Sequence, residues 1–171
     1  MKKAYNIVTS VLLILLITLV ILLFLPKLLG YTPMAVLSGS MEPTYHVGSL
    51  IYVNKTSPGK VQVGDPITFY VSKDIVVTHR VTSVDREEQS FHTKGDANNT
   101  EDGGMVTYDR LIGKPAFSIP LLGYLAVYTG TRTGIIILMT LIVVVIILTF
   151  LPDWLMKEKE SEGEKHHERT Q

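Results

Sequence analysis

Residues Ile7–Leu25 read IVTSVLLILLITLVILLFL, an uncharged stretch of about 19 residues. A second uncharged stretch of about 18 residues, Gly134–Leu151, reads GIIILMTLIVVVIILTFL. As helices rising ~1.5 Å per residue, both would span roughly 27–29 Å, close to the ~30 Å thickness of the hydrocarbon core of a bilayer. A water-soluble domain of this size does not bury so long an apolar run on all faces. The sequence therefore predicts two transmembrane helices.

The first apolar stretch has an alternative interpretation as a cleavable signal peptide. Lys2 and Lys3 resemble the charged start of such a peptide, but the apolar run exceeds its usual ~7–15 residues. The sequence that follows, Pro26–Leu29, contains no small-x-small cleavage site. We therefore expect a retained membrane anchor.

Basic residues flank both apolar stretches and predict the orientation of the chain. Lys2 and Lys3 precede the first stretch, and four basic residues follow the second (Lys157, Lys159, Lys165 and Arg169). Such residues tend to stay in the cytoplasm, so both termini are expected inside and the centre outside. The expected organisation is a cytoplasmic N-terminus (1–6), a transmembrane helix (7–25), an extracytoplasmic β-rich domain (30–130), a second transmembrane helix (134–151) and a charged, disordered cytoplasmic tail (152–171).

Composition excludes several classes of function. The 171-residue chain is 46% hydrophobic with a formal net charge of zero, so no basic patch indicates a nucleic-acid partner. It has no cysteine, which removes thiol catalysis, disulfides and thiolate metal sites. His166 and His167 lie together in the tail without further ligands at useful spacing, so we expect neither a metal site nor a cofactor.

The central segment has the pattern of a β domain. Short runs rich in β-branched and aromatic residues alternate with turn signals containing Gly, Pro, Asp and Asn. The runs are Ser49–Val53, Ile67–Val71, Ile75–Val84, Ser90–Thr93 and Leu111–Gly113. No helical periodicity longer than two turns occurs between Tyr31 and Lys114. The predicted fold class is mainly β, a compact antiparallel β domain between two transmembrane α-helices.

Candidate catalytic residues lie in this central segment. Ser40 stands in Ser38–Thr44, where small neighbours leave its hydroxyl accessible, and a serine needs a neighbouring base to become nucleophilic. His79 is a candidate base, and alternation along its strand places it on one face with Val77, Val81 and Ser83. That setting also suits a buried structural histidine.

Acidic residues on a later loop favour the catalytic interpretation. A carboxylate bonded to one imidazole nitrogen fixes the tautomer and leaves the other nitrogen to accept the serine proton. The segment Gly95–Asp102 carries such carboxylates at Asp96, Glu101 and Asp102. Serine, histidine and aspartate thus occur in an order compatible with a triad.

Four motifs in this order resemble those of type I signal peptidases. They are Ser38-Gly39-Ser40-Met41-Glu42-Pro43-Thr44, Gly64-Asp65-Pro66-Ile67, Thr78-His79-Arg80-Val81 and Thr93-Lys94-Gly95-Asp96-Ala97-Asn98. The resemblance extends over roughly Val36–Gly113 and to the Phe117–Tyr124 segment. It is to the endoplasmic-reticulum-type branch of archaea, eukaryotes and some Gram-positive bacteria, in which histidine replaces the lysine base.

The resemblance implies roles for five residues. Ser40 is similar to the nucleophile and His79 to its general base. Asp102 matches the acidic partner of the histidine, with the adjacent Glu101 as an alternative, and Asp96 matches a second acidic position of the catalytic set. Ser38 resembles the hydroxyl that joins the Ser40 backbone N–H in the oxyanion hole.

The implied substrates are the signal peptides of exported preproteins, cut after small residues. An extended peptide can add to a sheet edge as a strand, and Val36, Leu37 and Met41 are candidates for lining the substrate pockets or contacting lipid. Further expected partners are the bilayer and translocon or accessory subunits. The implied location is the plasma membrane, or the endoplasmic reticulum membrane in a eukaryote.

Two alternatives stay open at this point. A serine–lysine peptidase would use Lys73 or Lys94, but a lysine base must be buried to lose its proton, and both lie at polar turns. The other alternative is a non-catalytic, membrane-tethered β module of the secretion machinery. The joint presence of serine, histidine and acids argues against it.

Overall fold

The computed structural model describes the backbone of residues 2–168 and the side chains of residues 5–150. The chain divides into two units. One contains the outer segments, Met1–Leu22 and Thr131–Gln171, and the other is the central segment Leu23–Gly130.

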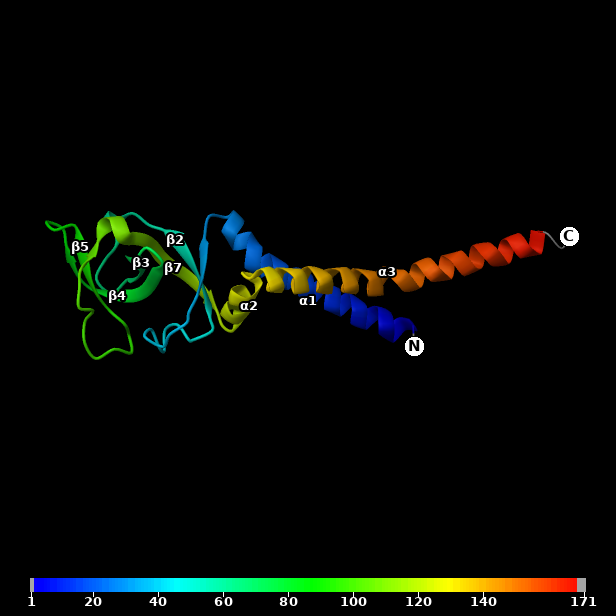
Figure 1. Cartoon of the computed structure of the whole chain (residues 1–171), viewed down its shortest axis with the longest axis horizontal. Coiled ribbons are helices and arrows are strands. Elements are labelled where there is room, and N and C mark those ends of the chain that lie inside the picture. The colour runs from blue at the N-terminus through cyan, green and yellow to red at the C-terminus, as the bar shows by residue number, and fades with distance from the viewer. Residues whose placement is uncertain (1, 169–171) are drawn as a thin grey trace. The chain divides into compact units, whose positions relative to one another are not determined.

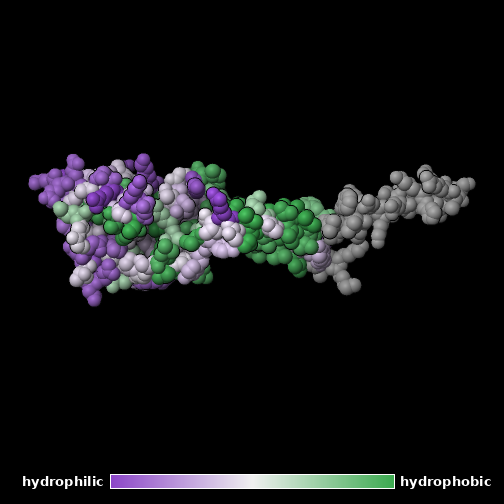
Figure 2. Space-filling model, in the orientation of Figure 1, coloured by the Kyte–Doolittle hydropathy of each residue, from purple (hydrophilic) through white to green (hydrophobic). Residues whose placement is uncertain are grey.

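The two long helices are α1 (Lys2–Leu28) and α3 (Arg132–Glu168). They contain apolar stretches long enough to cross a membrane, Tyr5–Leu28 and Arg132–Phe150, with mean hydropathies of 3.2 and 3.0. Apolar side chains form most of the visible surface of these stretches, as Figure 2 shows in green. Only 17% and 6% of their most apolar windows are buried, so these are not core helices of a soluble fold.

The backbone beyond the second apolar stretch differs from the prediction. The tail was expected to be disordered, but the backbone of α3 remains helical through Glu168. Its repeated Glu and Lys residues are good helix formers, which explains the difference. The side chains of this tail, including His166 and His167, lie outside the described residues.

The central unit is built on one antiparallel sheet with the strand order β1-β2-β7-β3-β4-β5-β6. Figure 1 labels five of these strands, β2, β3, β4, β5 and β7. The strands of the sheet are β1 (Thr32–Ala35), β2 (Leu50–Lys55), β3 (Pro66–Ser72), β4 (Ile75–Asp85), β5 (Ser90–Lys94), β6 (Val106–Thr107) and β7 (Leu111–Ile119). Short helices connect them, namely η1 (Pro58–Lys60), η2 (Tyr108–Arg110) and α2 (Leu122–Thr129). The mainly β prediction is therefore confirmed.

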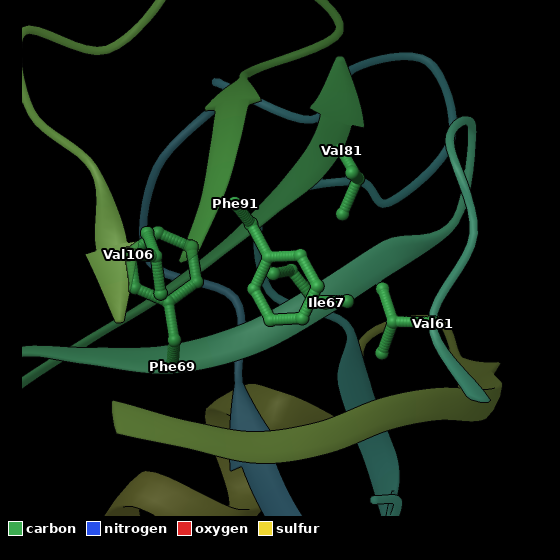
Figure 3. Close-up of a cluster of buried hydrophobic side chains, with 6 residues drawn as sticks. All are labelled: Val61, Ile67, Phe69, Val81, Phe91 and Val106. Atoms are coloured by element: carbon green, nitrogen blue, oxygen red, sulfur yellow. The ribbon is translucent and has the colours of Figure 1, made fainter. Parts of the chain in front are cut away.

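The hydrophobic core of the sheet lies beside the strand that carries His79. Figure 3 shows six buried side chains packed together, Val61, Ile67, Phe69, Val81, Phe91 and Val106. His79 is 8% exposed and lies two residues before Val81, on the same face of β4. This face therefore carries both a core residue and a candidate catalytic residue. Val81 is buried in the core on this face of β4, so the packing of Val81 also fixes the direction of the His79 side chain.

A bulge in β4 corrects one detail of the sequence analysis. Ser83 was expected to share the inward face, but the register of β4 against β5 shifts between Val81 and Ser83. The extra residue reverses the alternation, so Ser83 is exposed and Val84 packs against the core.

Helix α2 joins the sheet through two glycines. The Gly123 N–H donates to the Gly48 carbonyl at 2.9 Å, and a Cβ on Gly123 would lie 2.4 Å from the Ser49 oxygen. Gly48 has φ +82°, and a Cβ there would overlap the ring of Tyr124. Only glycine at both positions permits this close contact.

Candidate functional site

Ser40 lies on a loop between β1 and β2 whose two ends are tied together. The Val36 N–H donates to the Ser49 carbonyl, and the Gly48 N–H donates to the Val36 carbonyl, both at 2.9 Å. Within this closed loop Ser40 is half-buried, and its hydroxyl lies 3.3 Å from that of Ser38. The loop thus brings together both serines that the sequence singled out.

His79 and Asp102 form a hydrogen-bonded pair. Nδ1 of His79 lies 2.6 Å from Oδ2 of Asp102, in a partly buried position. The same carboxylate oxygen accepts a 2.6 Å hydrogen bond from the Thr93 hydroxyl, and the Asp102 N–H donates to the Thr93 carbonyl at 2.9 Å. Thr93 on β5 therefore holds both the backbone and the side chain of Asp102, while Glu101 next to it is exposed. Asp102 is the acidic residue that contacts the histidine.

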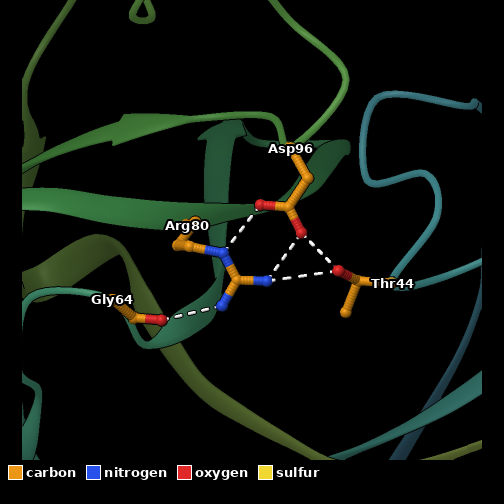
Figure 4. Close-up of polar contacts among 4 residues, drawn as sticks. All are labelled: Thr44, Gly64, Arg80 and Asp96. Carbon is orange, nitrogen blue, oxygen red and sulfur yellow. Dashed lines mark hydrogen bonds and ion pairs between the residues drawn. The ribbon is translucent and has the colours of Figure 1, made fainter.

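Asp96 is engaged elsewhere. Arg80 donates to its carboxylate through two nitrogens, Nε at 2.7 Å and Nη2 at 2.6 Å, and the Thr44 hydroxyl donates to it as well (Figure 4). The remaining Arg80 nitrogen, Nη1, donates to the Gly64 carbonyl at 2.7 Å. The Arg80 guanidinium holds the pKa of the Asp96 carboxyl below its ordinary value, and Asp96 raises the pKa of Arg80. Asp96 is thus an ionised hydrogen-bond partner of Arg80.

These contacts connect the nucleophile loop to β4 and to the loop after β5. Thr44 belongs to the nucleophile loop, and the Ala97 N–H, next to Asp96, donates to the Ser40 carbonyl at 2.9 Å. Gly95 makes room for this contact, since a Cβ there would lie 2.6 Å from the Ser40 oxygen. The position of the Ser40 backbone is therefore set by residues more than fifty positions later in the chain.

The geometry prepares His79 to accept a proton, but the Ser40 hydroxyl is not hydrogen-bonded to it in the described residues. With Nδ1 facing a carboxylate, a neutral imidazole carries its proton on Nδ1 and leaves Nε2 free to accept one. In the described residues no hydrogen bond joins the Ser40 hydroxyl to His79, and the serine is paired with Ser38 instead. Catalytic hydrogen bonds are often long in unliganded enzymes and shorten when substrate binds.

A cleft of about 500 Å³ opens beside Ser40. Its lining includes Ser38, Ser40 and all three pocket candidates, Val36, Leu37 and Met41. The opposite wall consists of the first residues of β4, Ile75–Thr78, although β1 and β4 are not neighbours in the strand order. The sheet therefore curls so that strand β1, at its edge, and β4 enclose one cleft. His79 and Asp102 line a second cavity of about 320 Å³.

The lysines of the alternative mechanism lie away from His79. Lys73 is exposed in the turn between β3 and β4 and lines a separate shallow pocket with Arg110. Lys94 is the register partner of Arg80, so its side chain leaves the sheet on the face opposite His79.

Sequence reasoning missed the residues that hold the candidate catalytic groups. Thr93 and Thr44 lie inside the recognised motifs, but no pattern in the sequence pairs Thr93 with Asp102 or Thr44 with Asp96. The one available signal was strand alternation, which places Arg80 on the face opposite His79 and so indicates a different acidic partner for each.

The sequence of the chain is similar to those of several known proteins. Residues 6–102, more than half of the chain, match the family described as signal peptidase, peptidase S26. Signal peptidase I W of Bacillus subtilis (strain 168) is 36% identical over 116 residues, which cover 60% of this chain and 61% of the relative. The catalytic subunit sec11 of the signal peptidase complex of Dictyostelium discoideum is 32% identical over 103 residues, covering 54% and 57%.

A third relative is also a catalytic subunit of a signal peptidase complex. The signal peptidase complex catalytic subunit SEC11C of Homo sapiens is 39% identical over 74 residues, covering 41% of this chain and 38% of the relative. The chain spans less than two thirds of the length of each of these three relatives. The matched region contains the Ser40 loop, His79 and Asp102, and on this basis the chain belongs to the signal peptidase family, peptidase S26.

Proposed function

We propose that the chain is a membrane-bound serine endopeptidase that removes signal peptides from exported preproteins. The observation that carries this proposal is the His79–Asp102 pair, held by Thr93 next to a loop whose Ser40 lines an open cleft. Family membership supports the substrate class. The two apolar helices support attachment to a bilayer, and the basic residues that flank them support an orientation with the central unit outside and both termini in the cytoplasm.

The proposed mechanism begins with rotation of the Ser40 hydroxyl from Ser38 toward His79 Nε2. His79 takes the hydroxyl proton while the serine oxygen attacks the scissile carbonyl carbon, and Asp102 stabilises the imidazolium that forms. The Ser40 N–H and the freed Ser38 hydroxyl stabilise the oxyanion. His79 then protonates the leaving amine, and a water molecule activated by His79 hydrolyses the acyl-enzyme.

The cleft supports recognition of an extended peptide. It lies between edge strand β1 and the start of β4, where a peptide can add main-chain hydrogen bonds and place alternate side chains in pockets. Met41 and Leu37 both line the cleft, but Met41 is 2% exposed whereas Leu37 is 77% exposed. Leu37 is thus available to contact either the substrate or lipid.

The test is cleavage of a model preprotein by purified protein in liposomes. Ser40→Ala removes a single oxygen atom, so we expect processing to stop while membrane insertion is unchanged. Ser38→Ala should retain activity but lose about 10²–10³ in turnover, the usual effect of one oxyanion donor. Substantial cleavage by purified Ser40→Ala protein contradicts the proposal.

A second comparison separates the histidine mechanism from the lysine mechanism. His79→Ala should be as damaging as Ser40→Ala, because residues that act as one unit fail together. Lys73→Ala and Lys94→Ala should retain cleavage, since neither side chain shares a face or loop with His79. Full activity of His79→Ala together with loss in a lysine variant would assign the base to lysine.

A further inference from the structure

Helix α2 exposes apolar side chains on most of its surface. Leu122–Thr129 reads LGYLAVYT and contains no charged residue. Its buried residues are Leu122 and Gly123, and one side of the Tyr124 ring lies against Gly48. Four of the other residues are large and 43–59% exposed, namely Tyr124, Leu125, Val127 and Tyr128. An exposed apolar surface of this kind marks a site of contact with a membrane or with another protein.

Chain connectivity indicates that this contact is with the membrane. Two residues separate the end of α2 at Thr129 from the start of the second apolar stretch at Arg132. With consecutive Cα atoms 3.8 Å apart, the two helix ends lie at most about 11 Å from each other. The end of α2 must therefore lie close to the point where an α3 that crosses the bilayer would enter it.

The other apolar helix reaches the central unit at the same place. Helix α2 packs against β1 and β2, and three residues separate the start of β1 at Thr32 from the end of α1 at Leu28. Both connections to the apolar helices thus enter the central unit around β1 and α2. Tyr31 in one connection and the two tyrosines of α2 are the residue type that concentrates at membrane–water interfaces.

We propose that α2 lies in the headgroup region of the extracytoplasmic leaflet and fixes the height of Ser40 above the bilayer. The inference rests on the proposed function for the crossing of α1 and α3 and for the role of Ser40. It adds an interaction surface for a lipid bilayer, made by Tyr124, Leu125, Val127 and Tyr128.

The link from α2 to Ser40 runs through backbone contacts. The Gly123 N–H binds the Gly48 carbonyl, and the ring of Tyr124 lies against Gly48. Gly48 in turn donates to Val36, which closes the loop that carries Ser40. The two hydrogen bonds of this path join backbone atoms only, so a movement of α2 relative to the lipid moves the base of the nucleophile loop with it.

Depth-dependent quenching of tryptophan fluorescence tests the position of α2. The single natural tryptophan, Trp154, is first replaced by phenylalanine, and one new tryptophan is then introduced into the full chain. The probe is Leu125→Trp in α2, the control for the membrane interior is Met139→Trp in α3, and the control for water is Val63→Trp, whose native side chain is 63% exposed. The proteins are reconstituted in liposomes brominated either near the headgroup or near the acyl-chain end.

We expect the tryptophan at 125 to be quenched most by the shallow bromines, the one at 139 by the deep bromines, and the one at 63 by neither. No quenching at 125, or quenching as deep as at 139, overturns the interfacial position of α2. Loss of quenching at 139 overturns the crossing of α3 itself, and the proposal for α2 falls with it. None of these readouts depends on peptidase activity, so failure here is distinct from failure of the catalytic assignment.

The effect on Ser40 is tested with Leu125→Glu, matched by Val63→Glu. A charge on α2 should lift the helix from the lipid, so cleavage of a preprotein embedded in liposomes should fall several-fold. Cleavage of a short, water-soluble peptide in detergent should be unchanged, because α2 does not line the cleft. Equal loss on both substrates indicates damage to the fold, and no loss on either means that α2 does not set the height of Ser40; both outcomes overturn the proposal.

Discussion

The His79–Asp102 pair depends on a residue that no motif identifies as functional. The resemblance favoured Asp102 as the acidic partner, with the adjacent Glu101 as an alternative. The backbone bond from Asp102 to Thr93 fixes the register of the loop, and the Thr93 hydroxyl then orients the carboxylate. Candidate catalytic groups could therefore be named from the sequence, but their pairing required the register of the sheet.

Removing the charge of Asp102 should slow turnover far more than it alters folding. In chymotrypsin-type proteases the loss of this carboxylate lowers kcat about 10⁴-fold, because the histidine adopts the wrong tautomer. We expect Asp102→Asn to approach this loss, measured as kcat on a peptide substrate. Thr93→Val should lower kcat less, since it removes one hydrogen bond to a charged group, about 1.5–3 kcal/mol at most.

Glu101→Gln is the matched control, because Glu101 is the exposed neighbour of Asp102. It should leave kcat within a few-fold of the wild type. A greater loss from Glu101→Gln than from Asp102→Asn would move the orienting role to Glu101.

At the scale of elements, the Arg80–Asp96 pair should make stability depend on pH. The pKa of Asp96 is lowered on folding by its hydrogen bonds from Arg80. The pair therefore stabilises the fold fully above the pKa of the unfolded carboxyl, and its contribution is lost as the pH falls through the lowered pKa of the folded state. Asp96→Asn should reduce the free energy of unfolding by about 1.5–3 kcal/mol at pH 7, and this difference should shrink in acid.

Denaturant unfolding of both proteins over a series of pH values measures this difference. Asp109→Asn, at an exposed position in η2, is the control and should show no such trend. A deficit in Asp96→Asn that stays constant down to acid pH would argue against an ionised Asp96.

The contact between α2 and the nucleophile loop should not tolerate a methyl group. Gly123→Ala places a Cβ within 2.4 Å of the Ser49 oxygen and 2.7 Å of the Gly48 oxygen, and both are backbone atoms. We expect a lower melting temperature and a loss of cleavage, because the helix must move away from the loop. Gly59→Ala is the control, since a Cβ there has no neighbour within 4 Å. Equal melting temperatures for the two variants would show that the contact is loose.

The elements that sequence reasoning missed are short or contain proline. Strand β6 has two residues and β1 has four, including Pro33, a residue confined to positions such as edge strands. Only the start of β7 was predicted, and its remainder contains Pro115 beside a register shift in its pairing with β2. The missed helix α2 has eight residues and is fixed by contact with the sheet rather than by its own helix propensity. Longer strands with clear patterns, such as β4, were predicted correctly.

At the scale of the whole molecule, the orientation in the membrane is the property with the simplest test. The basic residues outside the two apolar stretches predict cytoplasmic termini and an exported centre. Protease added to intact cells or spheroplasts should cut within the 31–130 region and spare an epitope placed after Gln171. Protection of the central region together with loss of the epitope would reverse the topology.

The hydrogen bond from Ala97 to the Ser40 carbonyl has a consequence for biosynthesis. A chain growing from the ribosome exposes its serine long before residues 97–102 have been made and exported. Until they arrive, Ser40 lacks its backbone support and His79 lacks its carboxylate. A nascent chain arrested short of Asp102 should therefore lack peptidase activity, including activity toward its own N-terminal apolar helix.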